Sequence, residues 1–443
     1  MPVKHKSKGS HKLSAPVAIP IATSGEVFDG AMIELIQDIA TDSLRLLLWD
    51  GATKTIGPIV KYKGRFYEPT AISRSLLRAM TLPTHSSPQG LTRALLAEIS
   101  KLAADLILLP EKLASLIGRF VLCTWLLEAT QIAPALAITG PDISRGIQLL
   151  DLLHCLSRHP VRMSAVTPAA LCSLPSALGC TLLISQSTIS GKMQRFLDDI
   201  SRRGQKIPSR GALVDLYGCQ AIHSESDFQN GPWSPRYIQI PMLATAQPLP
   251  ILDASTQSCI ASEFQPKLLD FRLVNLGKAC STRFDMVGFS HQLRPLAQSL
   301  AAATPEDADL QAEVAELLKD EEKDVRSANW VDLSTVAIEA ILVACDERKG
   351  PIAYVGELAE IAQEIMKRRG KKADIDPGAL GKKLKFLGFT TEPRDARGVS
   401  LALTESVCSL AHQLSRDFDV PDRETREVKT AARGKRGSPE GGS

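Results

Sequence analysis

Between residues 131 and 290, short apolar runs alternate with longer amphipathic segments, and this alternation constrains the fold more than any other feature. Runs such as PALAITG, GCTLLISQ and RYIQIPML have the length and composition of buried strands. Segments such as ISRGIQLLDLLHCL and KMQRFLDDISRR repeat apolar residues with the period of a helix. Strands that alternate with helices are typical of an α/β domain with a mostly parallel sheet.

The whole chain of 443 residues is long enough for two or three domains. Turn signals between apolar runs at 42–70 predict a small β-meander, and residues 71–130 have helical periodicity. We expect a disordered basic tail at 1–25, a small β-rich segment at 26–89, a helical lead-in and α/β core at 90–290, a helical linker at 291–329, a compact C-terminal module at 330–418 and a disordered tail at 419–443.

The composition excludes several classes of protein. The nine cysteines are scattered and never spaced CxxC, which favours reduced thiols in a cytoplasmic protein over a disulfide framework or a zinc site. We expect no metal site, because the histidines and cysteines lack the usual ligand spacings. No apolar run is long enough to span a membrane. The net charge is only +3, so any affinity for nucleic acid must come from local patches.

The stretch LAITGPDISRGIQLL, at 136–150, has the outline of a phosphate-binding loop. In the pattern GxxxxGK[ST], backbone amides, the lysine and the hydroxyl hold the phosphates and Mg²⁺. Gly140 begins the motif and Ser144 is its last variable position, but Arg145 replaces the second glycine. Gly146 replaces the lysine and Ile147 replaces the hydroxyl residue. The groups that would bind the phosphate and the metal are therefore missing.

Two further features belong to the same pattern. The run GCTLLISQ ends in Ser185 and Gln186, where a second strand of such an enzyme ends in acids. Arg236 directly precedes the run YIQIP. Residues 90–290 thus resemble the P-loop (RecA/AAA-like) ATPase core of phage- and plasmid-type primase-helicases. The resemblance implies a nucleotide site at Gly140, Ser144, Arg145 and Gly146, with Arg236 as an arginine finger.

Because the lysine, the hydroxyl and the acid are all absent, we expect no hydrolysis, no catalytic residue and no cofactor. Arg145 either holds a phosphate in place of the lysine or points into water, and we favour water. ATP and Mg²⁺ belong only to the alternative of an atypical ATPase or helicase. A second basic cluster follows in DDISRRGQKIPSRG, where a loop either faces nucleic acid or is simply solvated. Its cations are Arg202, Arg203, Lys206 and Arg210.

Residues 330–418 predict three helices, two short strands and a last helix. Asp376 and Pro377 are suited to begin the third helix, whose leucines form a buried stripe. This order resembles a winged helix-turn-helix. Cations outnumber acids ten to five over 361–400, which favours DNA binding over protein docking. The candidate DNA contacts are Lys382, Lys383 and Lys385 on the third helix, Arg394 and Arg397 at the wing, and Arg368 and Arg369 before that helix.

Together these features predict a cytoplasmic DNA-binding protein of replication or mobile-element type, whose ATPase-like core acts as a scaffold. One alternative is the atypical ATPase or helicase. Another is an assembly partner of an intact homologous ATPase. The expected partners are DNA and either further copies of this chain or such an ATPase subunit, but not a membrane.

Overall fold

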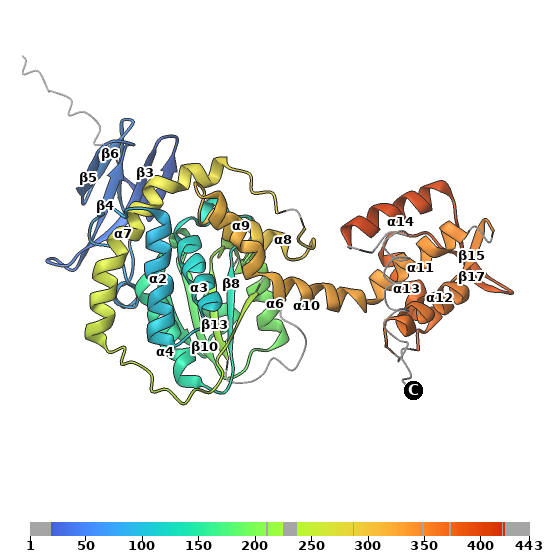
Figure 1. Cartoon of the computed structure of the whole chain (residues 1–443). Coiled ribbons are helices and arrows are strands. Elements are labelled where there is room, and N and C mark those ends of the chain that lie inside the picture. The colour runs from blue at the N-terminus through green and yellow to red at the C-terminus, as the bar shows by residue number, and fades with distance from the viewer. Residues whose placement is uncertain are drawn as a thin grey trace, which may run out of the picture. The chain divides into compact units, whose positions relative to one another are not determined.

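The computed structural model describes residues 19–209, 211–224, 237–286, 288–347, 350–371, 374–418 and 420. Contacts divide the chain into two compact units. The first comprises residues 1–231, 239–282 and 302–306, and the second comprises residues 232–238, 283–301 and 307–443. Figure 1 labels the elements of both units.

A five-stranded sheet with the order β14-β8-β13-β10-β9 forms the centre of the α/β core. The pairs β8–β13, β13–β10 and β10–β9 are parallel. Side chains at 135–138 and 182–184 are at most 3% exposed, as expected for strands with both faces covered. The predicted mixed α/β class is confirmed. The strands are β8 (Ala135–Thr139), β9 (Pro160–Ser164), β10 (Thr181–Gln186), β13 (Gln220–Ser224) and β14 (Tyr237–Pro241).

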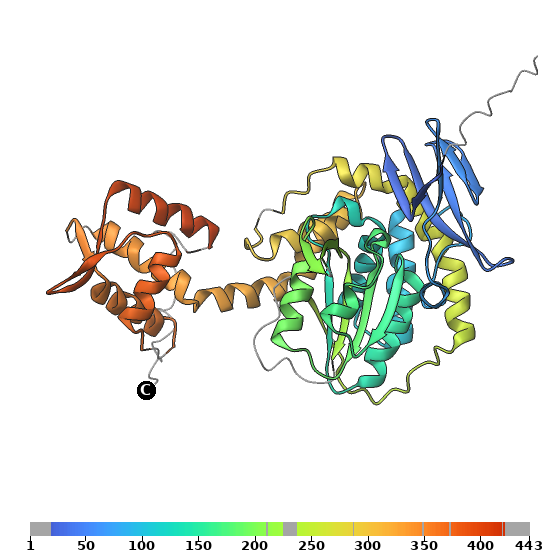
Figure 2. The ribbon, with the colours of Figure 1, turned by 180° about the vertical axis from the view of Figure 1, so that it is seen from behind.

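Helices cover this sheet and supply most of the remaining core. Helix α4 packs against β9, β10 and β13, and α7 packs against both α3 and α4. Figure 1 shows α2, α3 and α4 in front of the sheet, and Figure 2 shows the same layers from behind. The helices are α2 (Thr92–Ile107), α3 (Glu111–Trp125), α4 (Ile143–Leu156), α5 (Pro168–Leu171), α6 (Gly191–Ile200) and α7 (Ala254–Ser281), with short 3-10 turns at η1 (Leu127–Ala129) and η2 (Ser176–Leu178).

Three features of the core differ from the sequence prediction. Strand β9 begins at a proline and had no clear apolar run to reveal it. The apolar run ALVDLYGCQAIHS at 212–224, which reads as a single strand, contains two strands, β12 (Ala212–Asp215) and β13. Strand β12 pairs with β11 (Lys206–Ser209) in an antiparallel hairpin. Helix α7 extends over 28 residues although it contains Pro266. Its burial on most sides leaves little helical periodicity to read.

The N-terminal strands form two small sheets, in the orders β2-β3-β4-β5 and β1-β7-β6. Strand β1 lies within the segment at 1–25 that we expected to be disordered, and it pairs in parallel with β7. Their core includes Val161 of β9 and Leu178 of η2, so the strands pack directly on the α/β core. The elements are β1 (Ile21–Thr23), β2 (Gly25–Phe28), β3 (Ala31–Asp38), β4 (Ser43–Trp49), β5 (Lys54–Gly57), β6 (Val60–Tyr62), β7 (Arg65–Pro69) and α1 (Arg74–Arg78).

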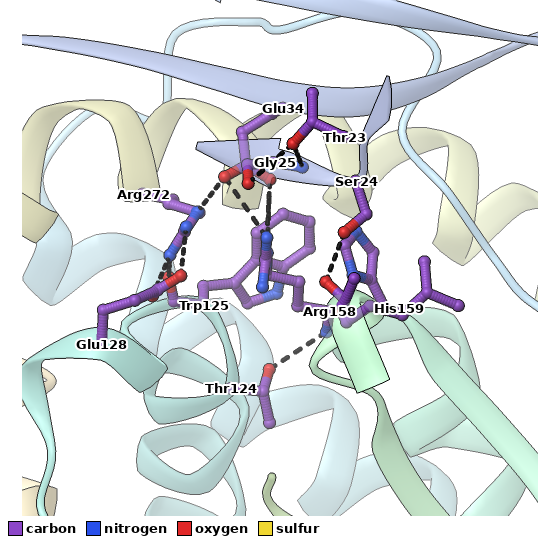
Figure 3. A network of polar contacts seen from close by, with 12 residues as sticks. Thr23, Ser24, Gly25, Glu34, Thr124, Trp125, Glu128, Arg158, His159 and Arg272 are labelled. Carbon is purple, nitrogen blue, oxygen red and sulfur yellow. Dashed lines mark hydrogen bonds and ion pairs between the residues drawn. The ribbon is translucent and has the colours of Figure 1, made fainter. Parts of the chain in front are cut away.

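A buried group of four charged side chains links these strands to the α/β core (Figure 3). Glu34 of β3 is 1% exposed and accepts hydrogen bonds from Arg158 at 3.0 Å and from Arg272 of α7 at 2.6 Å. Arg272 also donates to Glu128 at 2.6 Å. Two guanidinium groups and two carboxylates thus neutralise one another; Glu34, Arg158 and Arg272 are buried, whereas the side chain of Glu128 is 34% exposed. Such a group fixes the relative position of the three elements that contribute to it.

The second unit contains three helices followed by a compact C-terminal module. Helices α11, α12 and α13 pack against one another, and a three-stranded sheet with the order β15-β17-β16 completes the module. Strand β15 had not been predicted. The elements are α8 (Arg294–Ala302), α9 (Ala308–Leu317), α10 (Lys319–Trp330), α11 (Leu333–Glu347), β15 (Ile352–Tyr354), α12 (Val355–Arg368), α13 (Pro377–Phe386), β16 (Glu392–Asp395), β17 (Gly398–Ala402) and α14 (Glu405–Asp417).

The module also corrects the prediction that all cysteines are reduced. Cys345 of α11 and Cys408 of α14 form a disulfide, with Cα atoms 6.2 Å apart. The two residues are 63 positions apart in sequence, so no local spacing could reveal the pair. The other seven cysteines, all among the described residues, form no disulfide.

Candidate functional site

The carboxyl ends of the parallel strands meet at one edge of the sheet, where ligands of open α/β sheets bind. Strand β8 connects onward to β9 on one side of the sheet, whereas β13 connects to β14 on the other. The crevice expected at such a switch of direction lies between the ends of β8 and β13. The predicted phosphate loop follows β8 at this place. The geometry of the loop therefore decides whether the core can hold a nucleotide.

The loop after β8 is closed against the end of β14. Gly140 has φ 134°, and a Cβ atom there would lie 2.4 Å from the carbonyl oxygen of Met242. The Met242 amide donates to Thr139 at 2.6 Å, and the Asp142 amide donates to Met242 at 3.3 Å. The backbone amide of Asp142, which a bound anion would need, is thus bonded within the chain. Glycine at 140 permits this close backbone approach.

The N-terminus of α4 carries its own carboxylate. Asp142 is the N-cap, and its side chain accepts a hydrogen bond from the backbone amide of Arg145 at 3.1 Å. A helix N-terminus attracts an anion because its first amides lack partners and the helix dipole is positive there. Asp142 already supplies that negative charge. Ser144 is exposed in the same turn.

The structure corrects the prediction for Arg145, which is 5% exposed and does not point into water. Its guanidinium donates to three main-chain carbonyls, those of Ile107 at 3.0 Å, Leu108 at 2.9 Å and Leu243 at 2.5 Å. Ile107 and Leu108 end helix α2, where carbonyls lack partners and a cation is favourable. Arg145 therefore joins the end of α2 to the segment after β14, and each of its three guanidinium nitrogens donates a hydrogen bond within the chain.

The position of the missing lysine is equally filled. Gly146 packs on His223 of β13, and a Cβ atom at 146 would lie 2.3 Å from the imidazole ring. The ring is 1% exposed, and its Nδ1 lies 3.3 Å from the hydroxyl of Ser185. Any side chain at 146 would have to displace this buried ring. Arg236, the predicted arginine finger, lies outside the described residues.

The predicted basic loop is partly a hairpin. Lys206 is exposed at the start of β11, and Arg202 is exposed in the preceding turn. Arg203 donates to the carbonyls of Thr130 at 2.8 Å and Leu127 at 2.6 Å. It therefore joins this loop to the segment around η1. Arg210 lies outside the described residues. The cluster therefore has three exposed cations among those described, Arg202, Arg203 and Lys206, of which Arg203 is also bonded to the chain.

In the C-terminal module, helix α13 has one buried and one exposed face. Leu380 and Leu384 are fully buried, whereas Lys382 and Lys385 are exposed. Lys383 is half-buried. The predicted helix and its leucine stripe thus place two of the three lysines in solvent, as a nucleic-acid contact requires.

The sequence reasoning missed Phe386, which is 81% exposed on α13. Its ring lies 5.3 Å from the ammonium of Lys383. Gly378 and Ala379 are exposed in the first turn and lie on the same side as Lys382 and Phe386 by helical spacing. Small residues allow close approach of a partner, and an exposed phenylalanine is able to contact a thymine methyl group. The exposure of Phe386 could have been predicted from the sequence, because Phe386 lies outside the buried leucine stripe of the helix.

The cations outside α13 divide into two groups. Arg369 is corrected: its side chain is 4% exposed, pairs with Glu339, and lies 4.1 Å from the ring of Trp330. It stabilises the module and is not on the surface. Arg368 is exposed and pairs with Glu364 at 3.3 Å, and Arg397 is exposed at the β16–β17 turn. Arg394 lies in β16, but its side chain is not among those described.

A cleft of about 220 Å³ lies at the amino edge of the sheet, opposite the predicted nucleotide site. Its walls include Glu128, Arg158, Arg203 and Asp215. Two of these side chains are acidic and two are basic. Arg158 and Glu128 already form ion pairs with Glu34 and Arg272, respectively. The cleft therefore has no excess of positive charge for phosphates. Among the described residues no cluster of three metal-ligating side chains occurs, and no described helix is long and apolar enough to cross a membrane.

No known protein-family model matches the chain, and no curated protein does so either. Solved structures show weak similarity. The C-terminal region of NrS-1 is 10% identical, with a TM-score of 0.34 over 84% of this chain and 97% of that chain. A full-length MCM homolog from Methanopyrus kandleri is 10% identical, with a TM-score of 0.35 over 63% and 69%. Cdc6p from Pyrobaculum aerophilum is 12% identical, with a TM-score of 0.19 over 69% and 93%.

Proposed function

We propose that this chain is a DNA-binding protein, in which the exposed face of α13 contacts DNA and the α/β core is a scaffold that does not hydrolyse nucleotides. The observation that carries the proposal is the surface of α13, where Lys382, Lys385 and Phe386 are exposed together. Arg397 at the neighbouring hairpin turn adds a further cation. Lysines supply the phosphate contacts, and Phe386 supplies an apolar contact with base edges.

The closed loop after β8 supports the scaffold part of the proposal. Asp142, Arg145 and Gly146 are each engaged within the chain, so the atypical-ATPase alternative lacks free groups for the phosphates. Membership of the replication or mobile-element class is part of the proposal and comes from the resemblance. The assembly-partner alternative requires that this chain bind an intact homologous ATPase and have no affinity for DNA itself.

The test is charge reversal on α13 in the full chain. Lys382→Glu with Lys385→Glu should weaken binding to duplex DNA at least tenfold and reduce the slope of log K against log salt by about 2, because each phosphate contact contributes about 0.9. The measurement is fluorescence anisotropy at several salt concentrations. Lys101→Glu with Lys192→Glu is the matched control, because both lysines are exposed on other helices. Equal effects of the two pairs would contradict the assignment of α13.

A further inference from the structure

The hairpin formed by β6 and β7 ends in an unusual turn. Tyr62 pairs with Arg65, and the two residues between them, Lys63 and Gly64, have φ values of 47° and 80°. A two-residue turn with positive φ at both positions favours Asn-Gly or Asp-Gly. A lysine in the left-handed region is disfavoured, so Lys63 adopts this conformation against its local preference. An outlier of this kind at an exposed tip is the starting point for a hypothesis of function.

The hairpin carries positive charge without local neutralisation. Lys61, Lys63 and Arg65 are all exposed. Residues 51–67 contain no aspartate or glutamate, and no salt bridge joins these three cations to a carboxylate within the described part of the chain. Lys54 of the preceding strand β5 differs, because it pairs with Asp270 at 2.5 Å. The nearest acid along the chain, Glu68, lies at the far end of β7 from the tip.

Aromatic rings alternate with these cations. Lys61 faces Phe66 across the ladder, and its ammonium lies 5.4 Å from the ring centre. The ammonium of Lys63 lies 5.2 Å from the ring of Tyr62. Both rings are half-buried, and Tyr62 is held by Phe28 with ring centres 4.7 Å apart. The ring of Tyr62 is therefore held in place by Phe28, and part of each of the two rings remains exposed.

We propose that the β6–β7 hairpin is a binding site for single-stranded DNA. Exposed cations follow the phosphates of a single strand, and aromatic rings stack on its unpaired bases. Duplex DNA offers its phosphates to such a hairpin but no unpaired base face for stacking, because its bases are stacked inside the helix. The site lies in the first unit and does not depend on the proposed role of α13.

The test uses the full chain carrying Lys382→Glu and Lys385→Glu, so that binding through α13 is already weakened. Adding Lys61→Glu, Lys63→Glu and Arg65→Glu should weaken binding to fluorescent oligo(dT) at least tenfold. The slope of log K against log salt should fall by about 2, at about 0.7 for each phosphate contact with a single strand. The matched control reverses Lys101, Lys192 and Lys323, which are exposed on three separate helices. Equal effects of the two triplets would overturn the proposal.

Two single variants separate binding from folding. Lys63→Asn should raise the thermal midpoint by about 1–3 °C, because asparagine tolerates positive φ, while it weakens oligo(dT) binding. Greater stability with unchanged binding would overturn the role of Lys63. Phe66→Ala should weaken oligo(dT) binding roughly fivefold or more, but leave binding to duplex DNA unchanged. If poly-glutamate binds the hairpin as well as oligo(dT) at equal charge, the site accepts acidic protein and the DNA assignment is wrong.

Discussion

Glu34→Ala is expected to destabilise the protein by about 3–5 kcal/mol, because it leaves Arg158 and Arg272 buried with only Glu128 to neutralise them. Glu34 is 1% exposed and receives hydrogen bonds from both guanidinium groups. Chemical unfolding of the two proteins measures the difference directly. Asp38→Ala is the control, because Asp38 lies on the same strand but forms a more exposed pair with Arg45. Its loss should stay within about 1 kcal/mol. Similar losses from the two variants would show that the buried group does not join the β segment to the core.

The same group makes stability depend on pH. Burial alone would raise the pKa of the Glu34 carboxyl, but Arg158 and Arg272 outweigh it and hold this pKa below its ordinary value. Burial, with Arg158 beside it, lowers the pKa of His159 to about 3. In both cases the unfolded chain takes up a proton at a higher pH than the folded chain. The free energy of unfolding therefore decreases as the pH is lowered. The loss should begin near pH 6.5, from His159, and steepen below about pH 5 as the carboxylates contribute. In Glu34→Ala the loss of unfolding free energy below about pH 5 should be smaller, because one of these carboxylates is gone.

Gly146→Ala is expected to destabilise the core by about 1–3 kcal/mol, as overpacking does in a tightly filled interior. The added methyl group would meet the buried ring of His223 at 2.3 Å. Gly277→Ala is the matched control: it lies in the interior of α7, and a Cβ atom there meets nothing within 4 Å. That change should stabilise the protein by about 0.5–1 kcal/mol, because alanine is the better helix former.

Combining Gly146→Ala with His223→Ala should cost less than the two single changes added together, since the smaller side chain makes room for the methyl group. Simple additivity would mean that the ring and the glycine do not oppose each other. Gly146→Lys, which restores the lysine of the phosphate-loop pattern, should not create ATP binding. The lysine would first have to displace the ring.

The periodicity of the sequence predicted the architecture well because it reflects burial. The runs that became β8 and β10 are buried on both faces, and α4 and α13 each have one apolar face. Strand β9 and helix α7 escaped prediction because each contains a proline, and α7 is buried on most sides. These are cases in which tertiary contacts decide the structure more than local preference.

The roles of individual site residues were harder to predict than the elements that carry them. Arg145 binds carbonyls about 38 and 98 positions away, and Arg369 pairs with Glu339 across two helices. No local spacing encodes such partners, so both cations looked free in the sequence. Gly146 was recognised as a departure from the phosphate-loop pattern, but the reason for it, His223, lies on another strand. Phe386 could have been found, since an aromatic residue off the buried stripe of a helix is exposed by spacing alone.

The central claim is that this chain binds DNA through α13 while its core holds no nucleotide. The most direct measurement is the binding of duplex DNA to the full chain with and without Mg²⁺ and ATP, together with binding of a fluorescent ATP analogue. The account predicts saturable, salt-sensitive DNA binding that nucleotide does not change, and no saturable binding of the analogue. DNA binding that requires ATP, or saturable analogue binding without any DNA affinity, would contradict it.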